Sequence, residues 1–418
     1  MNHFQYRGPD LWAEDVPVAK ITAEVGTPCY LYSLATLRRH YRVFDEAFAD
    51  VPHIVCYSIK ANSNLAVIRV FAQAGSGFDI VSGGELFRAL RAGADPRKIV
   101  FSGIGKTRDE IGYALREGIL CFNVESGAEL EMIDAVAAEA GRKAPIAVRV
   151  NPDVDPRTHP YISTGMKKSK FGIEIRLALE AYERARSLRN LDVVGVDCHI
   201  GSQLTDVSPF SDALERVRSL VGELRRRNFP IRYLDFGGGL GITYNEETPP
   251  EPRAYGAALK KGLADLDLTL LLEPGRVLVG NAGILVTKVL YLKSTDTKNF
   301  VIVDGAMNDL IRPALYDAYQ RIEPVRREER PPVVVDVVGP VCESGDFFAK
   351  DRELAGVRPG ELLAVRSAGA YGFVMSSNYN SRPRAPEVLV DGSTFHVVRS
   401  RETLDDLVRG ETIPDSLR

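Results

Sequence analysis

The chain has 418 residues, with 53 Lys+Arg against 56 Asp+Glu, 45% apolar residues and 26% charged residues. This composition is ordinary for a globular protein and excludes disordered, collagen-like and coiled-coil classes. The formal net charge of -3 gives no electrostatic footprint for nucleic acid or for an anionic membrane. At roughly 100–200 residues per domain, the length predicts two or three domains, or one large barrel with an appendage.

The cysteines are odd in number and lack any zinc-binding spacing, so we expect reduced thiols rather than disulfides or a metal site. They are Cys29, Cys56, Cys121, Cys198 and Cys342. The first four are expected in the core, and Cys342 lies in a polar loop. The N-terminus lacks the apolar region of a signal peptide, and no segment approaches the ~20 apolar residues of a membrane helix. We therefore expect a soluble, cytoplasmic protein.

Short apolar runs alternate with helical patterns from residue 54 to residue 273. The eight runs are residues 54–59, 77–82, 99–103, 119–124, 146–151, 193–200, 231–236 and 268–273. Helix-start patterns of the S/T-x-x-E type begin at Ser82, Thr107 and Ser126, and Ser208-Pro209 opens another helix. Glycines that suit helix ends stand at positions 75, 93, 118 and 141. Eight strands alternating with helices predict a (β/α)₈ barrel.

A doubly wound sheet is the competing interpretation. It is weakened because the glycines of residues 237–241 lack the spacing of a dinucleotide-binding turn. Residues 101–107 resemble a phosphate-binding P-loop, but Val100 occupies the required upstream glycine position.

The pattern changes after Arg276 to strand-like segments, with Asp391-Gly392 as a predicted hairpin turn. This half is predicted to be a β-barrel or sandwich. The fold class is therefore α/β: a barrel of residues 35–277, with a mainly β domain formed by residues 1–34 and 278–418.

Polar or glycine residues follow the predicted strands, at the end of a (β/α)₈ barrel where active sites lie. They are Lys60, Asp79, Ser102, Glu125, Asn151, His199, Gly237, Gly238, Gly239, Glu273 and Arg276. Because loop mouths are polar in any case, the pattern favours a functional site without requiring one.

Each candidate has a functional and a structural interpretation. Partial desolvation of Lys60 would make its amine a nucleophile for an aldehyde, but a lysine at a strand end commonly reaches into solvent. The three glycines suit a phosphate, or simply a tight turn. Glu273 and Arg276 could bind a ring nitrogen and an anion, or form a surface ion pair. His199 could stack on a flat cofactor, move a proton, or lie at the rim.

Pyridoxal phosphate requires a lysine for its aldehyde, a seat for its phosphate and an acid for its ring nitrogen. The candidates supply all three, together with a histidine whose flat ring could stack on the cofactor. The sequence as a whole resembles the diaminopimelate decarboxylases, members of the alanine-racemase-like (fold type III) pyridoxal-phosphate enzymes. The motifs that carry the resemblance are residues 26–32, 57–62, 78–85, 159–165, 169–173, 199–203, 235–242, 273–276, 342–346, 370–372 and 379–384.

The resemblance implies a role for each candidate. Lys60 would bind the cofactor covalently, Glu273 would pair with its ring nitrogen, His199 would stack on the ring and Asp79 would lie near the lysine. The phosphate would be held by Ser202, Gly237, Gly238, Gly239, Gly275, Arg276 and Tyr371. The substrate would be held by Arg276, Arg312, Tyr316, Glu343 and Tyr371. Cys342 would donate a proton, and since Cys342 and Glu343 reach the neighbouring subunit's site in the family, a homodimer is implied.

The implied reaction is decarboxylation of meso-2,6-diaminopimelate to L-lysine, the last step of lysine biosynthesis. Arg312 and Glu343 would match the distal charges of that substrate, and ornithine would leave an arginine unpaired. A basic amino-acid decarboxylase of the ornithine or arginine type, with the same fold, is the first alternative. A non-catalytic cofactor-binding homologue is the second, although Lys60 and Cys342 are both present.

Overall fold

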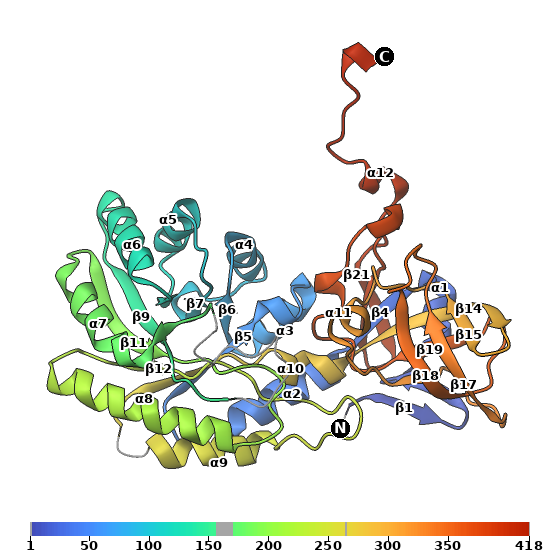
Figure 1. The fold of residues 1–418 in the computed structure, drawn as a ribbon, viewed down its shortest axis with the longest axis horizontal. Coiled ribbons are helices and arrows are strands. Elements are labelled where there is room, and N and C mark those ends of the chain that lie inside the picture. The colour runs from blue at the N-terminus through green and yellow to red at the C-terminus, as the bar shows by residue number, and fades with distance from the viewer. Residues whose placement is uncertain (1, 156–169, 264–265, 418) are drawn as a thin grey trace. The chain divides into compact units, whose positions relative to one another are not determined.

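The structure, a computed structural model, describes residues 2–155, 170–263 and 266–417. The chain divides into two compact units, one of residues 37–279 and one that joins residues 1–36 to residues 280–418 (Figure 1). No helix in the described ranges is both long enough and apolar enough to cross a bilayer.

Eight parallel strands close into a barrel within residues 37–279. Their order around the barrel is β9-β11-β12-β13-β5-β6-β7-β8, and β8 pairs back onto β9. The strands are β5 (His53–Ser58), β6 (Gly77–Ile80), β7 (Ile99–Phe101), β8 (Cys121–Val124), β9 (Ala144–Asn151), β11 (Leu191–Asp197), β12 (Tyr233–Asp235) and β13 (Thr269–Leu272). A short strand, β10 (Ile173–Glu174), pairs with β9 outside this ring. Closure confirms the predicted barrel and excludes the doubly wound sheet, which would leave two open edges.

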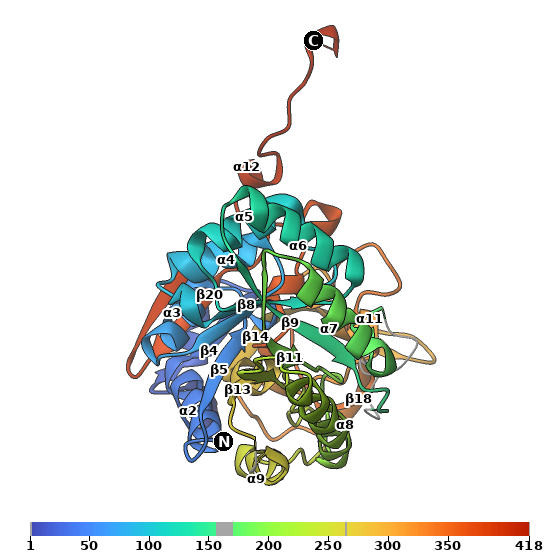
Figure 2. The same ribbon diagram turned by 90° about the vertical axis from the view of Figure 1, so that its left-hand side faces the viewer.

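Helices surround the strands as an outer layer, which Figure 2 shows most clearly. They are α2 (Leu34–Glu46), α3 (Leu65–Gln73), α4 (Gly83–Arg91), α5 (Arg108–Glu117), α6 (Gly127–Glu139), α7 (Ala178–Ser187), α8 (Ser208–Arg226), α9 (Pro252–Leu263) and the short α10 (Arg276–Val279). On α8 the predicted apolar face is buried against the barrel, including Phe210, Leu214 and Val217.

The predicted helix starts are confirmed at Ser82, Thr107 and Ser126, each of which accepts a hydrogen bond from the N–H three residues later. Only Thr107 has the reciprocal bond that completes a capping box. In the other two helices the glutamate extends one residue further back, to the N–H before the cap. The full capping box was therefore a wrong prediction at those two positions.

The barrel interior contains a cluster of small and medium apolar side chains. It consists of Cys56, Val100, Cys121, Ala147, Val194 and Leu271, all essentially fully buried. This packing accounts for two of the four cysteines that were predicted as core residues, and Cys29 and Cys198 are buried as well. This cluster packs the barrel interior, and the polar residues of the predicted site lie at the carboxyl ends of the strands.

The other unit is mainly β, as predicted. Its large sheet has the order β18-β17-β15-β14-β4-β20-β21, with β19 joining β14 to β16, and a three-stranded sheet holds β1, β2 and β3. The elements of residues 1–36 are β1 (Phe4–Arg7), β2 (Asp10–Ala13), β3 (Val16–Pro17), α1 (Val18–Val25) and β4 (Cys29–Ser33). The elements of residues 280–418 are β14 (Gly283–Ser294), β15 (Asn299–Val303), α11 (Arg312–Tyr316), β16 (Ile322–Pro324), β17 (Pro332–Val338), β18 (Phe347–Ala355), β19 (Leu362–Val365), β20 (Glu387–Asp391), β21 (Thr394–Arg399) and α12 (Leu404–Leu407).

Strand β4 ties the N-terminal segment into this unit, because it pairs with both β14 and β20. Its residues Cys29 and Leu31 enter the apolar core together with Ile284, Val286 and Val388. The hairpin between β20 and β21 turns at Gly392, with φ +57°, which confirms the predicted turn.

Candidate active site

Lys60 lies at the carboxyl end of β5, on a single 3₁₀ turn of residues Ile59–Ala61. Its Nζ is 2.5 Å from Oδ2 of Asp79, which belongs to the neighbouring strand β6 and is fully buried. The hydroxyl of Ser58 donates to the same Oδ2 at 2.7 Å. The Lys60 side chain is 37% exposed, so it is only partly desolvated, as predicted. A partly exposed amine that lies beside a carboxylate is suited to react with a bound aldehyde.

Glu273 follows β13 and is 6% exposed. Ser102 Oγ, after β7, donates to its Oε1 at 3.2 Å, and Asn123 Nδ2, on β8, lies 3.4 Å from the same oxygen. No described residue forms a hydrogen bond with Oε2. Burial raises the pKa of Glu273 well above its usual range, and the negative charges of Asp235 and Asp79 raise it further. The carboxyl is thus fixed through one oxygen and available through the other.

His199 follows β11 and contacts the glycine turn after β12. The N–H of Gly238 donates to its Nδ1 at 3.1 Å, so this ring nitrogen is an acceptor. Burial lowers the pKa of His199 well below its usual range, and the positive charges of Arg149 and Lys60 lower it further. The imidazole is therefore neutral near pH 7, as a ring that stacks on a flat cofactor should be.

Close packing leaves no room for a side chain in the glycine turn. A Cβ on Gly237 would lie 2.5 Å from His199 Nδ1, and one on Gly239 would lie 2.6 Å from the carbonyl oxygen of Gly201. The N–H of Gly237 donates to Asp235 at 3.0 Å, as that of Gly238 does to His199. Of the three N–H groups, only that of Gly239 has no acceptor among the described residues. The close packing supports the structural interpretation of these glycines, and phosphate binding stays a prediction.

Arg276 begins α10 and is 6% exposed. Its Nη1 donates to the hydroxyl of Tyr244 at 2.7 Å, and its Nη2 donates to Ser202 Oγ at 3.0 Å. The surface ion pair considered for Glu273 and Arg276 is absent among the described residues, because both side chains are buried and bonded elsewhere. Two neutral hydroxyls therefore orient the guanidinium within the site.

Buried acids outnumber buried cations at this end of the barrel. Asp79, Asp197 and Asp235 are each at most 1% exposed, and Oδ1 of Asp79 has no hydrogen-bond partner among the described residues. Arg149 on β9 offsets part of this charge through Glu125 at 3.1 Å and, more distantly, Asp197 at 3.9 Å. Such a surplus suits a site that receives a cationic or proton-bearing group.

The remaining predicted residues belong to the mainly β unit. Arg312 is buried at the start of α11, where its Nη1 donates to the Gln320 side-chain oxygen at 2.6 Å, and Tyr316 ends the same helix. Cys342 and Glu343 are exposed. Tyr371 has a positive φ of 54°. The structure thus brings the barrel residues together and leaves these five in the other unit.

Five polar residues of the site were not singled out from the sequence: Asn123, Arg149, Asp197, Asp235 and Tyr244. Asp235 precedes the glycines by two positions, so its place was readable, but it reads as the end of an apolar run. Asn123 and Tyr244 give no comparable signal. The predicted motif of residues 159–165, and the first residue of the motif of residues 169–173, lie outside the described residues.

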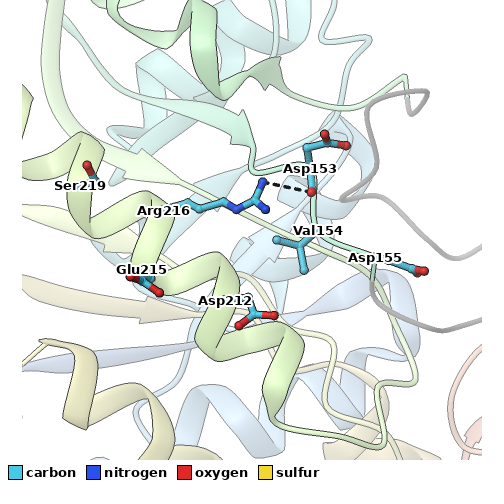
Figure 3. A pocket seen from close by; sticks show the side chains of 7 residues that line it. All are labelled: Asp153, Val154, Asp155, Asp212, Glu215, Arg216 and Ser219. Carbon is cyan, nitrogen blue, oxygen red and sulfur yellow. Dashed lines mark hydrogen bonds between the residues drawn. The ribbon is translucent and has the colours of Figure 1, made fainter.

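A cavity of about 610 Å³ lies between α8 and the segment after β9 (Figure 3). Four carboxylates line it, those of Asp153, Asp155, Asp212 and Glu215. Arg216 donates to the carbonyl oxygens of Pro152 and Asp153, at 2.5 and 3.1 Å, and so ties α8 to that segment. None of the predicted site residues lines this cavity.

The chain is similar to known proteins over nearly its whole length. Residues 34–280 match the family described as pyridoxal-dependent decarboxylase, pyridoxal binding domain. The chain is 57% identical, over 99% of both chains, to a diaminopimelate decarboxylase of Pseudomonas aeruginosa. The crystal structure of diaminopimelate decarboxylase from Helicobacter pylori complexed with L-lysine is similar, with a TM-score of 0.91, 43% identity, and coverage of 94% of this chain and 98% of that one. The crystal structure of diaminopimelate decarboxylase from M. jannaschii in co-complex with L-lysine is also similar, with a TM-score of 0.95, 38% identity and coverage of 99% of both chains.

Proposed function

Because the chain belongs to the diaminopimelate decarboxylase family, within the pyridoxal-dependent decarboxylases, we propose a role for each residue of its site. The enzyme is a carboxy-lyase that uses pyridoxal 5'-phosphate to convert meso-2,6-diaminopimelate to L-lysine and CO₂, the last step of lysine biosynthesis. When bound, the cofactor withdraws electrons from the bond to the departing carboxylate. The observation that carries the assignment is that Lys60 and Glu273 share one barrel mouth.

The residues present fit this cofactor. Lys60 would hold it through its amine, with Asp79 fixing the position of that amine. Glu273 would bind the ring nitrogen through Oε2, the oxygen that no described residue occupies, and the proton-bearing ring would offset part of the surplus of buried acid. His199 would lie on the ring as a neutral imidazole.

The phosphate would be seated by Gly237, Gly238, Gly239, Ser202, Gly275, Arg276 and Tyr371. Within the turn, Gly239 would donate its N–H, while Gly237 and Gly238 supply space and rigidity. Arg276 is already oriented by Ser202 and would add charge at one end. Residues 35–277 would thus form the cofactor-binding domain, and residues 1–34 and 278–418 the β domain.

The substrate would be held by Arg276, Arg312, Tyr316, Glu343 and Tyr371, and Cys342 would return the proton to the carbon that loses CO₂. Arg312 and Glu343 together supply the opposite charges that the distal end of meso-diaminopimelate requires. Ornithine would leave the arginine without its carboxylate, which costs about 1–3 kcal/mol. This charge argument separates the assignment from an ornithine-type decarboxylase.

We also propose a cytoplasmic homodimer whose active sites are shared, with Cys342 and Glu343 acting in the partner's site. The exposure of Cys342 and Glu343 supports the proposal that they act in the partner's site. Mixing equal amounts of Lys60→Ala and Cys342→Ala subunits tests it. If sites are shared, half of the dimers regain one intact site, so activity returns to about a quarter of the unmutated level. Sites confined to single subunits would give no recovery.

The function itself is tested by CO₂ release from the cofactor-loaded enzyme, offered meso-diaminopimelate, ornithine, arginine and lysine in parallel. Release from diaminopimelate alone, lost in Lys60→Ala, is the expected result. Release from ornithine or arginine would overturn the roles of Arg312 and Glu343. No release from any substrate by the loaded enzyme would favour a non-catalytic homologue.

A further inference from the structure

The amide of Asn123 lies at the centre of a polar cluster within the barrel. Its Nδ2 is 3.0 Å from Asp235 Oδ2, 3.1 Å from Ser102 Oγ and 3.4 Å from Glu273 Oε1. Asn123 is fully buried, so its orientation is set by these neighbours. A reversed amide would place its oxygen against two carboxyl groups and a hydroxyl, which fixes the nitrogen on this side.

An amide nitrogen has two hydrogens, so it cannot satisfy three acceptors equally. The two shorter contacts, to Asp235 and Ser102, take them. Ser102 then accepts from Asn123 and passes its own hydrogen to Glu273 Oε1, 3.2 Å away. The result is a directed chain of donors from Asn123 through Ser102 to Glu273.

Asp235 fixes the start of this chain. Its Oδ2 accepts from Asn123 and its Oδ1 accepts from the N–H of Gly237 at 3.0 Å. One carboxyl therefore links the glycine turn to the residue that orders Ser102. Both halves of the predicted cofactor site are connected through this single side chain.

The donors oppose a strong electrostatic bias. Glu273 is within electrostatic range of the acids Asp79, Asp197 and Asp235, which favour its neutral form, and of the cations Lys60 and Arg149, which favour its charged form. Burial adds to the bias toward the neutral acid. A neutral Glu273 could not act as the counter-ion of a protonated ring nitrogen, so a donor at Oε1 is required to hold the carboxylate.

We propose that Ser102 and Asn123 are positioning residues that hold Glu273 as a carboxylate through Oε1 and leave Oε2 for the ring nitrogen of the cofactor. This inference rests on the proposed role of Glu273. Neither residue touches the reacting atoms; each acts through the protonation state of that one carboxyl.

The first test is the ¹⁵N chemical shift of the ring nitrogen in enzyme loaded with ¹⁵N-labelled pyridoxal phosphate. Ser102→Ala should move the signal toward that of an unprotonated pyridine, with the ratio of protonated to unprotonated nitrogen falling about tenfold or more, since a hydrogen bond to a charged group is lost. Ser102→Thr keeps the hydroxyl and should restore the signal. Ser102→Cys, with its weakly donating thiol, should fall between.

Ser76→Ala is the matched control. Ser76 is 3% exposed and Ser102 is 4% exposed, but the Ser76 hydroxyl bonds to the carbonyl oxygens of Val55 and Gly77 and to the side chain of Tyr41 rather than to a carboxyl group. Ser76→Ala removes the same hydroxyl oxygen from an equally buried position and should leave the ¹⁵N signal of the ring unchanged. A shift of equal size in both variants would mean general loosening of the barrel and would overturn the proposal.

A second readout does not need the cofactor. Infrared difference spectra of cofactor-free protein, each taken against its own Glu273→Gln partner, report when Glu273 loses its proton. Ser102→Ala should move that titration to higher pH, and Ser76→Ala should not. Identical titrations would refute the positioning role. An unprotonated ring nitrogen in the unmutated enzyme would instead refute the role of Glu273 itself, so the two failures are distinguishable.

Discussion

Replacing Gly238 by alanine is expected to displace Glu273 while leaving the barrel folded. Gly238 does not have a positive φ, so alanine is conformationally acceptable there. Its Cβ would, however, lie 2.2 Å from the carbonyl oxygen of Glu273, whereas Cβ contacts essentially never fall under 3.0 Å. The difference, 3.0 minus 2.2, requires a movement of about 0.8 Å between the turn and Glu273. Misplacement by about 1 Å can cost about a hundredfold in rate.

The assay is kcat for CO₂ release, together with cofactor affinity and thermal unfolding of the cofactor-free protein. We expect kcat to fall by about a hundredfold and the stability to fall by only about 1–3 kcal/mol, as in other overpacked interiors. Gly127→Ala is the control, because a Cβ there meets nothing within 4 Å and the residue begins α6. An unchanged kcat in Gly238→Ala would show that the position of Glu273 does not depend on this contact.

Three further outcomes follow from individual contacts. Cys342→Ala should lower kcat by about 10²–10⁴-fold if its thiol is the proton donor, and steady-state kinetics that match the unmutated enzyme would remove that role. Burial raises the pKa of Asp235 to about 7, with the charge of Asp197 adding to the effect, whereas an unfolded aspartate has a pKa of about 3.9. The stability that protonation of Asp235 contributes is complete below about pH 4 and is lost as the pH rises through about 7. The unfolding free energy of cofactor-free Asp235→Asn minus that of the unmutated protein should therefore increase over this pH range. A difference that does not change with pH in denaturant titrations would contradict this. Tyr244→Phe removes one of the two hydroxyls that orient Arg276 and should weaken phosphate binding by about tenfold, measured by cofactor titration, and an unchanged affinity would show that Ser202 suffices.

The barrel could be predicted because its signals are local. Each predicted strand is a short, mostly apolar run, and each of three helices starts at a serine or threonine cap, so the alternation was readable from one sequence. The second halves of two capping boxes were wrong because Glu85 and Glu129 bind the N–H one residue further back than the pattern requires. That choice depends on the direction in which the chain enters the helix, which the spacing does not encode.

The first layer of the site was likewise predictable, because residues that end parallel strands meet at one edge. The buried residues that contact these side chains from inside the barrel, Asn123 and Asp235, were not predictable. Asn123 lies one position inside β8 and Asp235 ends β12, so both read as interruptions of apolar runs. Their contacts come from closure of the barrel, which brings β8, β12 and β13 around one carboxyl. Which side chains of different strands meet inside the closed barrel is a long-range property that no local pattern specifies.

The measurement that tests the central claim most directly is to locate the cofactor on the chain. Borohydride reduction of the loaded enzyme fixes a cofactor that is bound to a lysine amine, and peptide mass spectrometry then identifies the lysine. The account predicts modification at Lys60, at the end of β5, and none in Lys60→Ala. Lys106 is a stringent comparison, because it is buried with Glu129 at 2.6 Å in the same barrel. Modification at Lys106 or any other lysine, with Lys60 unmodified, would contradict the account.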